Sequence, residues 1–422
     1  MGKGNLIIKD AAELITCSSF EAKKGQEMSR LDIIYDGTLV IEKGIITGAG
    51  KAEEVLSGLD LSSFDIIEAA GKAVLPGFID PHTHFVFGGY RAEEFSWRLR
   101  GDSYMEIMKR GGGIVNSVRA TRKASRDELI VSAKKRLDSM LSFGVTTVEG
   151  KSGYGLDRET EIKQLEVMRE LDTSHPVDVV STFLGAHAVP EEYRGNGDGF
   201  IDYLISEVLP DIAALKLAEF CDVFCERGVF SVEQSKQLLE KARTYGLKLK
   251  LHADEMTMLG GAELAAELGV VSADHLLYAS DRGIEKMAKA GVVAVLLPGT
   301  AFCLKEPYAR ARLMIDSGCA VALATDFNPG SCFTESIPLM FALATLYMGM
   351  TPEEALTAFT INAAAAIGRA EVVGSLDIGK AGDAVCLEFP SYRYIPYHSG
   401  VNSVEKVIKR GEVILDRKGK VI

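Results

Sequence analysis

The 422-residue sequence contains no apolar run of the roughly 18 residues that a membrane-spanning helix needs. It opens without the pattern of a secretory signal peptide. Its seven cysteines are odd in number and form no closely spaced framework. We therefore expect free thiols, a reducing cytoplasmic location and no membrane partner.

Positive charge is in deficit, because 47 Lys and Arg residues face 59 Asp and Glu residues and leave a formal net charge of -12. This balance argues against nucleic acid or an anionic membrane as the main partner, although it leaves room for a local basic pocket. Hydrophobic residues make up 47% of the chain and charged residues 25%, as in ordinary globular proteins.

Hydrophobic periodicity divides the chain into three parts. From residue 5 to about residue 72, short apolar runs alternate with turn residues, which predicts antiparallel β-structure. The middle of the chain alternates strand-like and helical patterns, and β character returns after Gly374. We expect a small composite β-sandwich domain from residues 1–72 and 370–422 around an α/β domain at 73–369.

The middle region holds eight strand-like runs separated by helical patterns such as 126–140 and 231–245. The runs are 73–84, 145–150, 178–187, 222–226, 248–252, 273–276, 292–297 and 320–326. Eight strands alternating with helices predict a TIM-like (β/α)8 barrel. A doubly wound open sheet is the competing architecture, but no Gly-x-Gly-x-x-Gly motif follows the first run.

Residues of types that commonly bind metals, histidine and aspartate, lie at the ends of these predicted strands. His82 and His84 are one residue apart in an extended run, so both imidazoles face the same side. Other strands end in His187, His252, His275 and Asp326. A barrel gathers the C-terminal ends of its strands at one face, so we expect these side chains to meet there. Taken singly, each histidine has an ordinary core or surface role as its alternative; together they suit one Zn²⁺ or Fe²⁺ ion.

The order of these residues resembles the amidohydrolase superfamily of metal-dependent barrels over nearly the whole chain. The resemblance implies that His82, His84, His252 and Asp326 hold the metal, and that a composite β domain accompanies the barrel. Some members hold two metals bridged by a carboxylated lysine at the end of the fourth strand. Residues 224–228 contain no lysine, so we expect one divalent ion per chain.

Further stretches resemble one branch of that superfamily, at 84–95, 111–115, 151–156, 183–187, 252–255 and 324–330. The resemblance implies hydrolysis of the cyclic amide of 4-imidazolone-5-propanoate to N-formimidoyl-L-glutamate, in histidine degradation. It also implies a homodimer.

That reaction needs an activated water, a stabilised oxyanion and a proton for the leaving nitrogen. Glu255 stands three residues after His252, where it can carry a proton, or it can serve instead as a carboxylate at a helix N-terminus. Asp326 is a second candidate for the base, and the sequence leaves the choice between them open. His275 is expected to donate a hydrogen bond to the oxyanion.

The propanoate group of such a substrate calls for a cation. By resemblance Arg91 binds this carboxylate with help from Tyr154 and His187, and its alternative is an ordinary surface arginine. Asn328 is expected to bond the polar edge of the ring, or else to serve the turn before Pro329. Residues 111–113, three consecutive glycines, predict a flexible or closely approached loop that could act as a lid.

Two rival functions remain open at this stage. Another amidohydrolase activity, such as deamination of a purine or pyrimidine base, would use much the same ligands, but a base carries no carboxylate for Arg91. A metal-free relative acting as a scaffold would be expected to have lost ligands, and the sequence retains all four.

Overall fold

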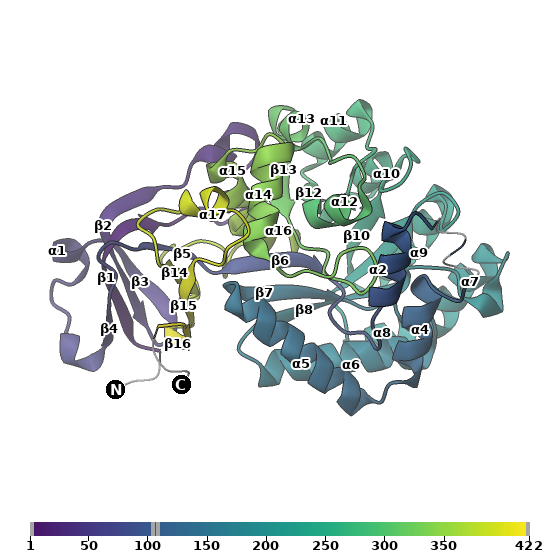
Figure 1. Cartoon of the computed structure of the whole chain (residues 1–422), viewed down its shortest axis with the longest axis horizontal. Helices are drawn as coiled ribbons and strands as arrows, with labels where there is room; N and C mark the ends of the chain where they lie inside the picture. Colours follow the sequence, from purple (N-terminus) through teal and green to yellow (C-terminus); the bar gives the residue numbers. More distant parts are fainter. Residues whose placement is uncertain (1–3, 103–105, 107–109, 419–422) are drawn as a thin grey trace.

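A computed structural model describes residues 4–102, 106 and 110–418 of the chain (Figure 1). Two sheets organise it: a ring of parallel strands surrounded by helices, and a second sheet built from both ends of the chain. Within the described residues, no helix has both the length and the apolar character needed to cross a bilayer.

The eight parallel strands of the first sheet follow one another around the ring in chain order. They are β6 (Phe78–Thr83), β7 (Val145–Lys151), β8 (Asp178–Ala186), β9 (Phe220–Cys225), β10 (Lys248–Ala253), β11 (Ser272–His275), β12 (Val293–Leu296) and β13 (Ala320–Leu323). The ring closes after β13, where the N–H of His84 donates to the carbonyl of Phe327 at 2.9 Å and the N–H of Asp326 donates to the carbonyl of His82 at 3.1 Å. The predicted (β/α)8 barrel is confirmed.

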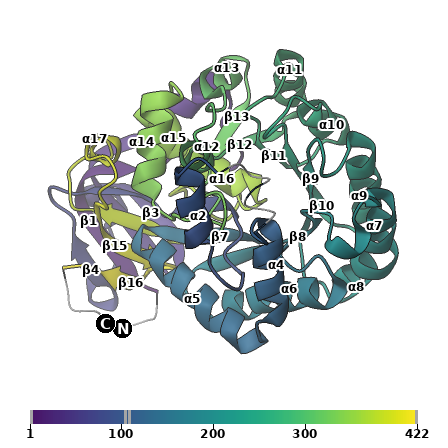
Figure 2. The same cartoon turned by 45° about the vertical axis from the view of Figure 1, so that its right-hand side comes forward.

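Helices pack around the barrel strands, most of them on the outside of the ring (Figure 2). The principal ones are α4 (Ile114–Lys123), α5 (Arg126–Ser142), α6 (Arg158–Ser174), α7 (Gly197–Tyr203), α8 (Leu209–Ala214), α9 (Val232–Thr244), α10 (Gly261–Leu268), α11 (Asp281–Ala290), α12 (Pro298–Leu304), α13 (Ala311–Asp316), α14 (Ile337–Tyr347), α15 (Pro352–Phe359) and α16 (Ile361–Ala366). Local sequence sets their starts: Ser125 and Glu128 form a capping box at α5, as Ser231 and Gln234 do at α9. Both helical patterns predicted from periodicity, 126–140 and 231–245, are thus present.

The second sheet draws strands from the two ends of the chain, which lie side by side in Figure 1. Its strands are β1 (Leu6–Ile15), β2 (Ile33–Glu42), β3 (Ile45–Lys51), β4 (Asp65–Glu68), β5 (Ala73–Pro76), β14 (Ala384–Leu387), β15 (Val404–Lys409) and β16 (Glu412–Asp416). β5 joins the two groups, since it pairs with β1 on one side and β14 on the other. Both ends therefore build one β unit, as the periodicity predicted.

The first predicted barrel strand, 73–84, is divided at Gly77. Residues before it form β5 in the second sheet, and residues after it form β6 in the barrel. A Cβ atom at Gly77 would lie 2.3 Å from Oγ1 of Thr146, so a larger residue would push the crossing chain off β7. One apolar run thus serves two sheets. The division into residues 1–72 with 370–422 and residues 73–369 stays our proposal for the domains.

Candidate metal centre and active site

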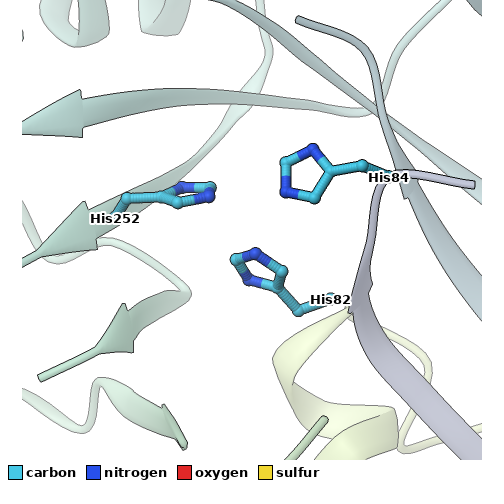
Figure 3. A group of neighbouring side chains, drawn as sticks. All are labelled: His82, His84 and His252. Atoms are coloured by element: carbon cyan, nitrogen blue, oxygen red, sulfur yellow. The ribbon is translucent and has the colours of Figure 1, made fainter. Parts of the chain in front are cut away.

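Three histidines converge at the C-terminal end of the barrel strands (Figure 3). His82 lies in β6, His84 directly follows it, and His252 lies in β10 across the ring. One nitrogen of each lies within 4.8 Å of the others, and all three side chains are buried. The structure thus brings together three of the four residues expected to bind metal.

Asp326, the fourth, reaches the same point from the segment after β13. Its Oδ1 atom lies 3.5 Å from Nε2 of His82 and 3.6 Å from Nε2 of His84. Two ligands of a tetrahedral zinc ion, each bonded at about 2.1 Å, stand roughly 3.4 Å apart, so these separations suit a shared ion. Thr300, on α12, donates its hydroxyl to Oδ2 of the same carboxylate.

The buried imidazole nitrogens fit a cation. Among the described residues, the buried Nε2 atoms of His82 and His252 have no hydrogen-bond partner, and Nε2 of His84 lies 3.6 Å from Oδ1 of Asp326. Burial, with a smaller effect of neighbouring positive groups, holds the pKa of His82 and of His84 well below the usual range. Neutral rings with unpaired nitrogens are the form in which histidine binds a divalent metal.

Two carboxylates that the sequence analysis missed orient these rings. Oδ2 of Asp274, in β11, lies 2.6 Å from Nδ1 of His82. Since a carboxylate only accepts, Nδ1 carries the hydrogen and Nε2 keeps its lone pair for a metal. Asp222, in β9, places Oδ2 3.0 Å from Nδ1 of His252 and favours the same tautomer there.

A buried lysine ties both carboxylates together below the histidines. Nζ of Lys151 lies 2.7 Å from Oδ2 of Asp222, 3.2 Å from Oδ2 of Asp274 and 3.1 Å from Oε1 of Glu149. Lys250 adds a second ammonium, 2.6 Å from Oε2 of Glu149. This charged layer, the set Glu149, Lys151, Asp222, Lys250 and Asp274, is fully buried. A signal for it was available, since Glu149 and Lys151 alternate in one strand and so share a face.

Glu255 lies beside His275, the residue that ends β11. Oε2 of Glu255 is 3.5 Å from Nε2 of His275. Burial, and then the negative charges of Asp326 and Glu226, raise the pKa of Glu255 to about 8. The two side chains expected to carry a proton and to bind the oxyanion are therefore neighbours.

The helix-capping role considered for Glu255 belongs to its neighbour Asp254. Oδ1 of Asp254 accepts hydrogen bonds from the N–H groups of Leu259, Gly260 and Gly261, at 2.9–3.1 Å, and Oδ2 accepts one from Ala262 at 2.9 Å. These amides open α10, where a carboxylate also complements the helix dipole. Glu255 is left free of that task.

Four residues at the same strand ends have strained backbones. Asp254, His275, Leu276 and Asp326 have positive φ angles of 50°, 78°, 63° and 51°, in the region that non-glycine residues seldom occupy. Such conformations cost free energy and persist where the surrounding structure fixes them, often at functional sites.

Tyr154 and His187 flank the histidine cluster on the side of β7 and β8. The ring of His187 stacks on that of His84, with centroids 5.0 Å apart, and the ring of Tyr154 lies 5.8 Å from His84. Burial lowers the pKa of His187 to about 3, so its ring is neutral. Its Nδ1 donates to the carbonyl of Gly153 at 3.0 Å, which leaves Nε2 as a hydrogen-bond acceptor.

The loop that carries Tyr154 is held by a further carboxylate, Glu161, that the sequence analysis also missed. Glu161 accepts hydrogen bonds from the N–H groups of Gly153, Gly155 and Leu156, at 2.8–3.0 Å. A buried glutamate in the helix that follows a glycine-rich loop was the available signal.

Arg91 stands at the start of α2 (Ala92–Leu99) and reaches toward the turn after Asp326. Its Nε donates to Oε2 of Glu94 at 2.8 Å. A Cβ atom at Gly330 would lie 2.1 Å from its Nη1, so the guanidinium rests against the Gly330 backbone. Arg91 is thus half-buried beside the site.

The side chain of Asn328 makes its hydrogen bonds within its own turn. Nδ2 donates to the carbonyl of Asp326 and to Oγ of Ser331, both at 2.7 Å, while Oδ1 accepts from the N–H groups of Gly330 and Ser331, both at 2.8 Å. The turn role that we kept as an alternative is therefore present, and contact between Asn328 and a substrate stays a prediction.

Comparison with known proteins gives one family and many close relatives. The model of the Amidohydrolase family matches residues 111–415. The chain is 64% identical over 414 residues to an imidazolonepropionase of Clostridium tetani, covering 98% of this chain and 99% of that protein. It is 60% identical over 415 residues to an imidazolonepropionase of Parabacteroides distasonis, covering 98% and 100%.

Solved structures share the fold at much lower identity. An adenosine deaminase of Xanthomonas campestris with bound zinc matches with a TM-score of 0.70 and 15% identity, covering 99% of this chain and 94% of that one. An atrazine chlorohydrolase of Arthrobacter aurescens complexed with zinc matches with a TM-score of 0.72 and 18% identity, covering 99% and 96%. At these identities the likeness shows the architecture alone.

Proposed function

The chain belongs to the amidohydrolase family, and from this premise we propose that it hydrolyses 4-imidazolone-5-propanoate to N-formimidoyl-L-glutamate in histidine degradation. The observation that carries the proposal is its identity of 64% with an imidazolonepropionase over 98% of the chain. In this reaction the ring amide C–N bond breaks, the carbonyl carbon gains the oxygen of water, and the nitrogen gains a proton.

His82, His84, His252 and Asp326 would hold one divalent ion, Zn²⁺ or Fe²⁺. The unpaired Nε2 atoms of His82 and His252 and the close grouping of His84 with them support this assignment, and zinc is bound in two proteins of the same fold. When bound, such an ion supplies Lewis acidity and lowers the pKa of water toward roughly 7. Asp274 keeps the His82 ring in the tautomer that presents Nε2, and Asp222 places a carboxylate oxygen 3.0 Å from Nδ1 of His252.

Glu255 is the better candidate for proton transfer. Oδ2 of Asp326 is engaged by Thr300, and its Oδ1 faces the histidines, so this carboxylate has no free oxygen for the task. A carboxyl with a pKa near the working pH can both accept and return a proton, and burial gives Glu255 that property. We assign it the transfer of a proton from the attacking water to the ring nitrogen.

His275 is assigned to the oxyanion. Its pKa is held well below the usual range, chiefly by burial, so the ring is neutral and carries one N–H group. A neutral donor fixed beside the reacting carbonyl stabilises charge that develops there without itself losing a proton.

Arg91 and Tyr154 are assigned to the propanoate carboxylate. The guanidinium supplies two parallel donors and the phenol a third, and burial raises the pKa of Tyr154, so that its proton is retained. His187, whose free nitrogen accepts, is better suited to an N–H group of the imidazolone ring than to the carboxylate. Asn328 holds the turn against which Arg91 rests.

Conversion of the imidazolone formed from urocanate by urocanase tests the proposal. Metal-loaded protein should consume the imidazolone absorbance and yield formimidoyl-glutamate, and Arg91→Ala should reduce kcat/KM by roughly 10–100-fold through loss of a charged hydrogen-bond partner. Failure of the loaded protein to turn over this compound, with activity on a purine or pyrimidine base instead, would replace the proposal by deamination. Protein that binds no Zn²⁺ or Fe²⁺ would point to the scaffold role.

Location and assembly complete the proposal. All seven cysteines are free thiols, which a reducing cytoplasm would preserve. We propose a cytoplasmic homodimer, and size-exclusion chromatography with light scattering tests the assembly.

A further inference from the structure

The carboxylate of Glu94 joins three segments beside the active site. Oε2 accepts hydrogen bonds from Nε of Arg91 and from the N–H of Gly113, both at 2.8 Å, and Oε1 accepts one from Nδ2 of Asn116 at 2.8 Å. Its side chain is buried, whereas the adjacent Glu93 is exposed. Glu94 therefore faces inward and is fully engaged.

Glu94 is ionised in this setting. Burial works against its charge, but the hydrogen bonds from Asn116 and Gly113, together with Arg91, lower its pKa. A carboxylate accepting three donors, one of them charged, is a rigid anchor because each bond restricts the orientation of the other two.

The Glu94 carboxylate determines the orientation of the Arg91 guanidinium. Glu94 occupies Nε, so the two Nη groups are turned away from it and toward the backbone of Gly330, where Nη1 fills the space that a Cβ atom would take. Gly330 lies four residues beyond Asp326. The forked edge of Arg91 is therefore held against the turn that follows Asp326, which preorganises it for a ligand bound there.

The glycine run at 111–113 has a place in the same arrangement. Gly113 has a φ of +81° and precedes the first turn of α4, and in this conformation its N–H points at Oε2 of Glu94. A larger residue would be strained at this φ. The glycine run thus donates a backbone hydrogen bond to the Glu94 carboxylate, and this contact requires no side chain at Gly113.

We propose that Glu94 is a positioning residue for substrate recognition, which holds Arg91 in the orientation that accepts the propanoate carboxylate. The inference rests on the proposed function, because it assumes that Arg91 binds that group. Because Glu94 would act through Arg91, its removal should weaken selection for the charged side chain more than it slows the chemistry.

The test uses Glu94→Gln, which keeps the shape of the side chain, with Glu93→Gln as the matched control. Affinity is measured by calorimetry for imidazole-4-propanoate and for its neutral amide, on metal-loaded protein. The preference for the acid over the amide should fall roughly tenfold in Glu94→Gln and stay unchanged in Glu93→Gln. In turnover of the imidazolone, KM should rise while kcat stays within about twofold.

A cycle with Arg91→Ala separates this inference from the proposed function. Glu94→Gln should add nothing in the Arg91→Ala background, since its effect passes through Arg91. If Arg91→Ala lowers the acid preference and Glu94→Gln does not, the positioning role is wrong and the proposed function stands. If Arg91→Ala itself leaves the preference unchanged, the carboxylate assignment fails and the positioning role fails with it.

Asn116→Ala gives a second measurement if Glu94→Gln unfolds. It removes only the hydrogen bond to Oε1, and a smaller loss of acid preference is expected. An unchanged preference, or an equal loss of affinity for acid and amide, would overturn the positioning role.

Discussion

Nδ1 of His82 lies 2.6 Å from Oδ2 of Asp274, across the barrel from β6 to β11. The contact fixes which nitrogen of His82 carries the hydrogen, and therefore which one a metal can use. The proposed metal site consequently depends on Asp274, a residue outside the four proposed ligands.

Asp274→Asn should weaken metal binding. An amide in place of the carboxylate can turn its NH₂ group toward the ring and no longer enforces one tautomer, so we expect the affinity for Zn²⁺ to fall about 10–100-fold. Competition with a chelating dye measures it. Asp281→Asn, on the exposed start of α11, is the control and should leave affinity unchanged. Equal affinities in both variants would remove Asp274 from the site.

Glu255→Gln should abolish most activity while the metal stays bound. The amide keeps the shape of the side chain but cannot carry a proton, so kcat should fall about 10²–10⁴-fold. Metal content by mass spectrometry and Tm should match those of the parent protein. Glu285→Gln, an exposed position on α11, serves as control. Full activity in Glu255→Gln would return the proton-transfer role to Asp326.

Gly330→Ala should displace Arg91 without unfolding the protein. The added methyl group meets the end of a flexible side chain 2.1 Å away, so Arg91 moves while the backbone stays. We expect KM to rise roughly tenfold, the cost of one misdirected charged hydrogen bond, with Tm nearly unchanged. The same substitution in Arg91→Ala should have no further effect on KM. An additive effect there would show that Gly330 acts through some other contact.

Cys303 should be the most readily alkylated cysteine, and its rate should increase as pH rises through about 7. A hydrogen bond from the Cys332 thiol, opposed by burial and aided by Arg98, lowers the pKa of Cys303 to about 7. The reactive thiolate is therefore absent well below pH 7 and fully formed above it. The other six cysteines are buried. Iodoacetamide labelling followed by peptide mass spectrometry gives the rates, and Cys332→Ser should move the midpoint of the curve.

The barrel and the residues that converge in it could both be predicted from the sequence, and for the same reason. Strand alternation placed His82 and His84 on one face, and barrel geometry gathered His252 and Asp326 to the same end. Both inferences depend only on regular secondary structure, which repeats along the chain.

What the sequence did not reveal depends on contacts between distant segments. Asp222 and Asp274 look like single polar residues in apolar strands until the closed barrel brings them to the imidazoles. Glu255 had a place at a helix N-terminus as its alternative role, and only the fold shows that Asp254 takes that role at α10. The division of one apolar run at Gly77 likewise depends on a close approach to Thr146, from a segment almost seventy residues away.

The charged layer beneath the histidines constrains how this protein can change. Lys151 and Lys250 stand among Glu149, Asp222 and Asp274 without access to water, so deleting one charge leaves the opposite charge uncompensated in a medium that cannot solvate it. Single neutral substitutions at these five positions should be rare among functional variants, whereas paired substitutions that remove an acid and a base together should be tolerated more often. We therefore expect the five residues of the charged layer to change together and not one at a time.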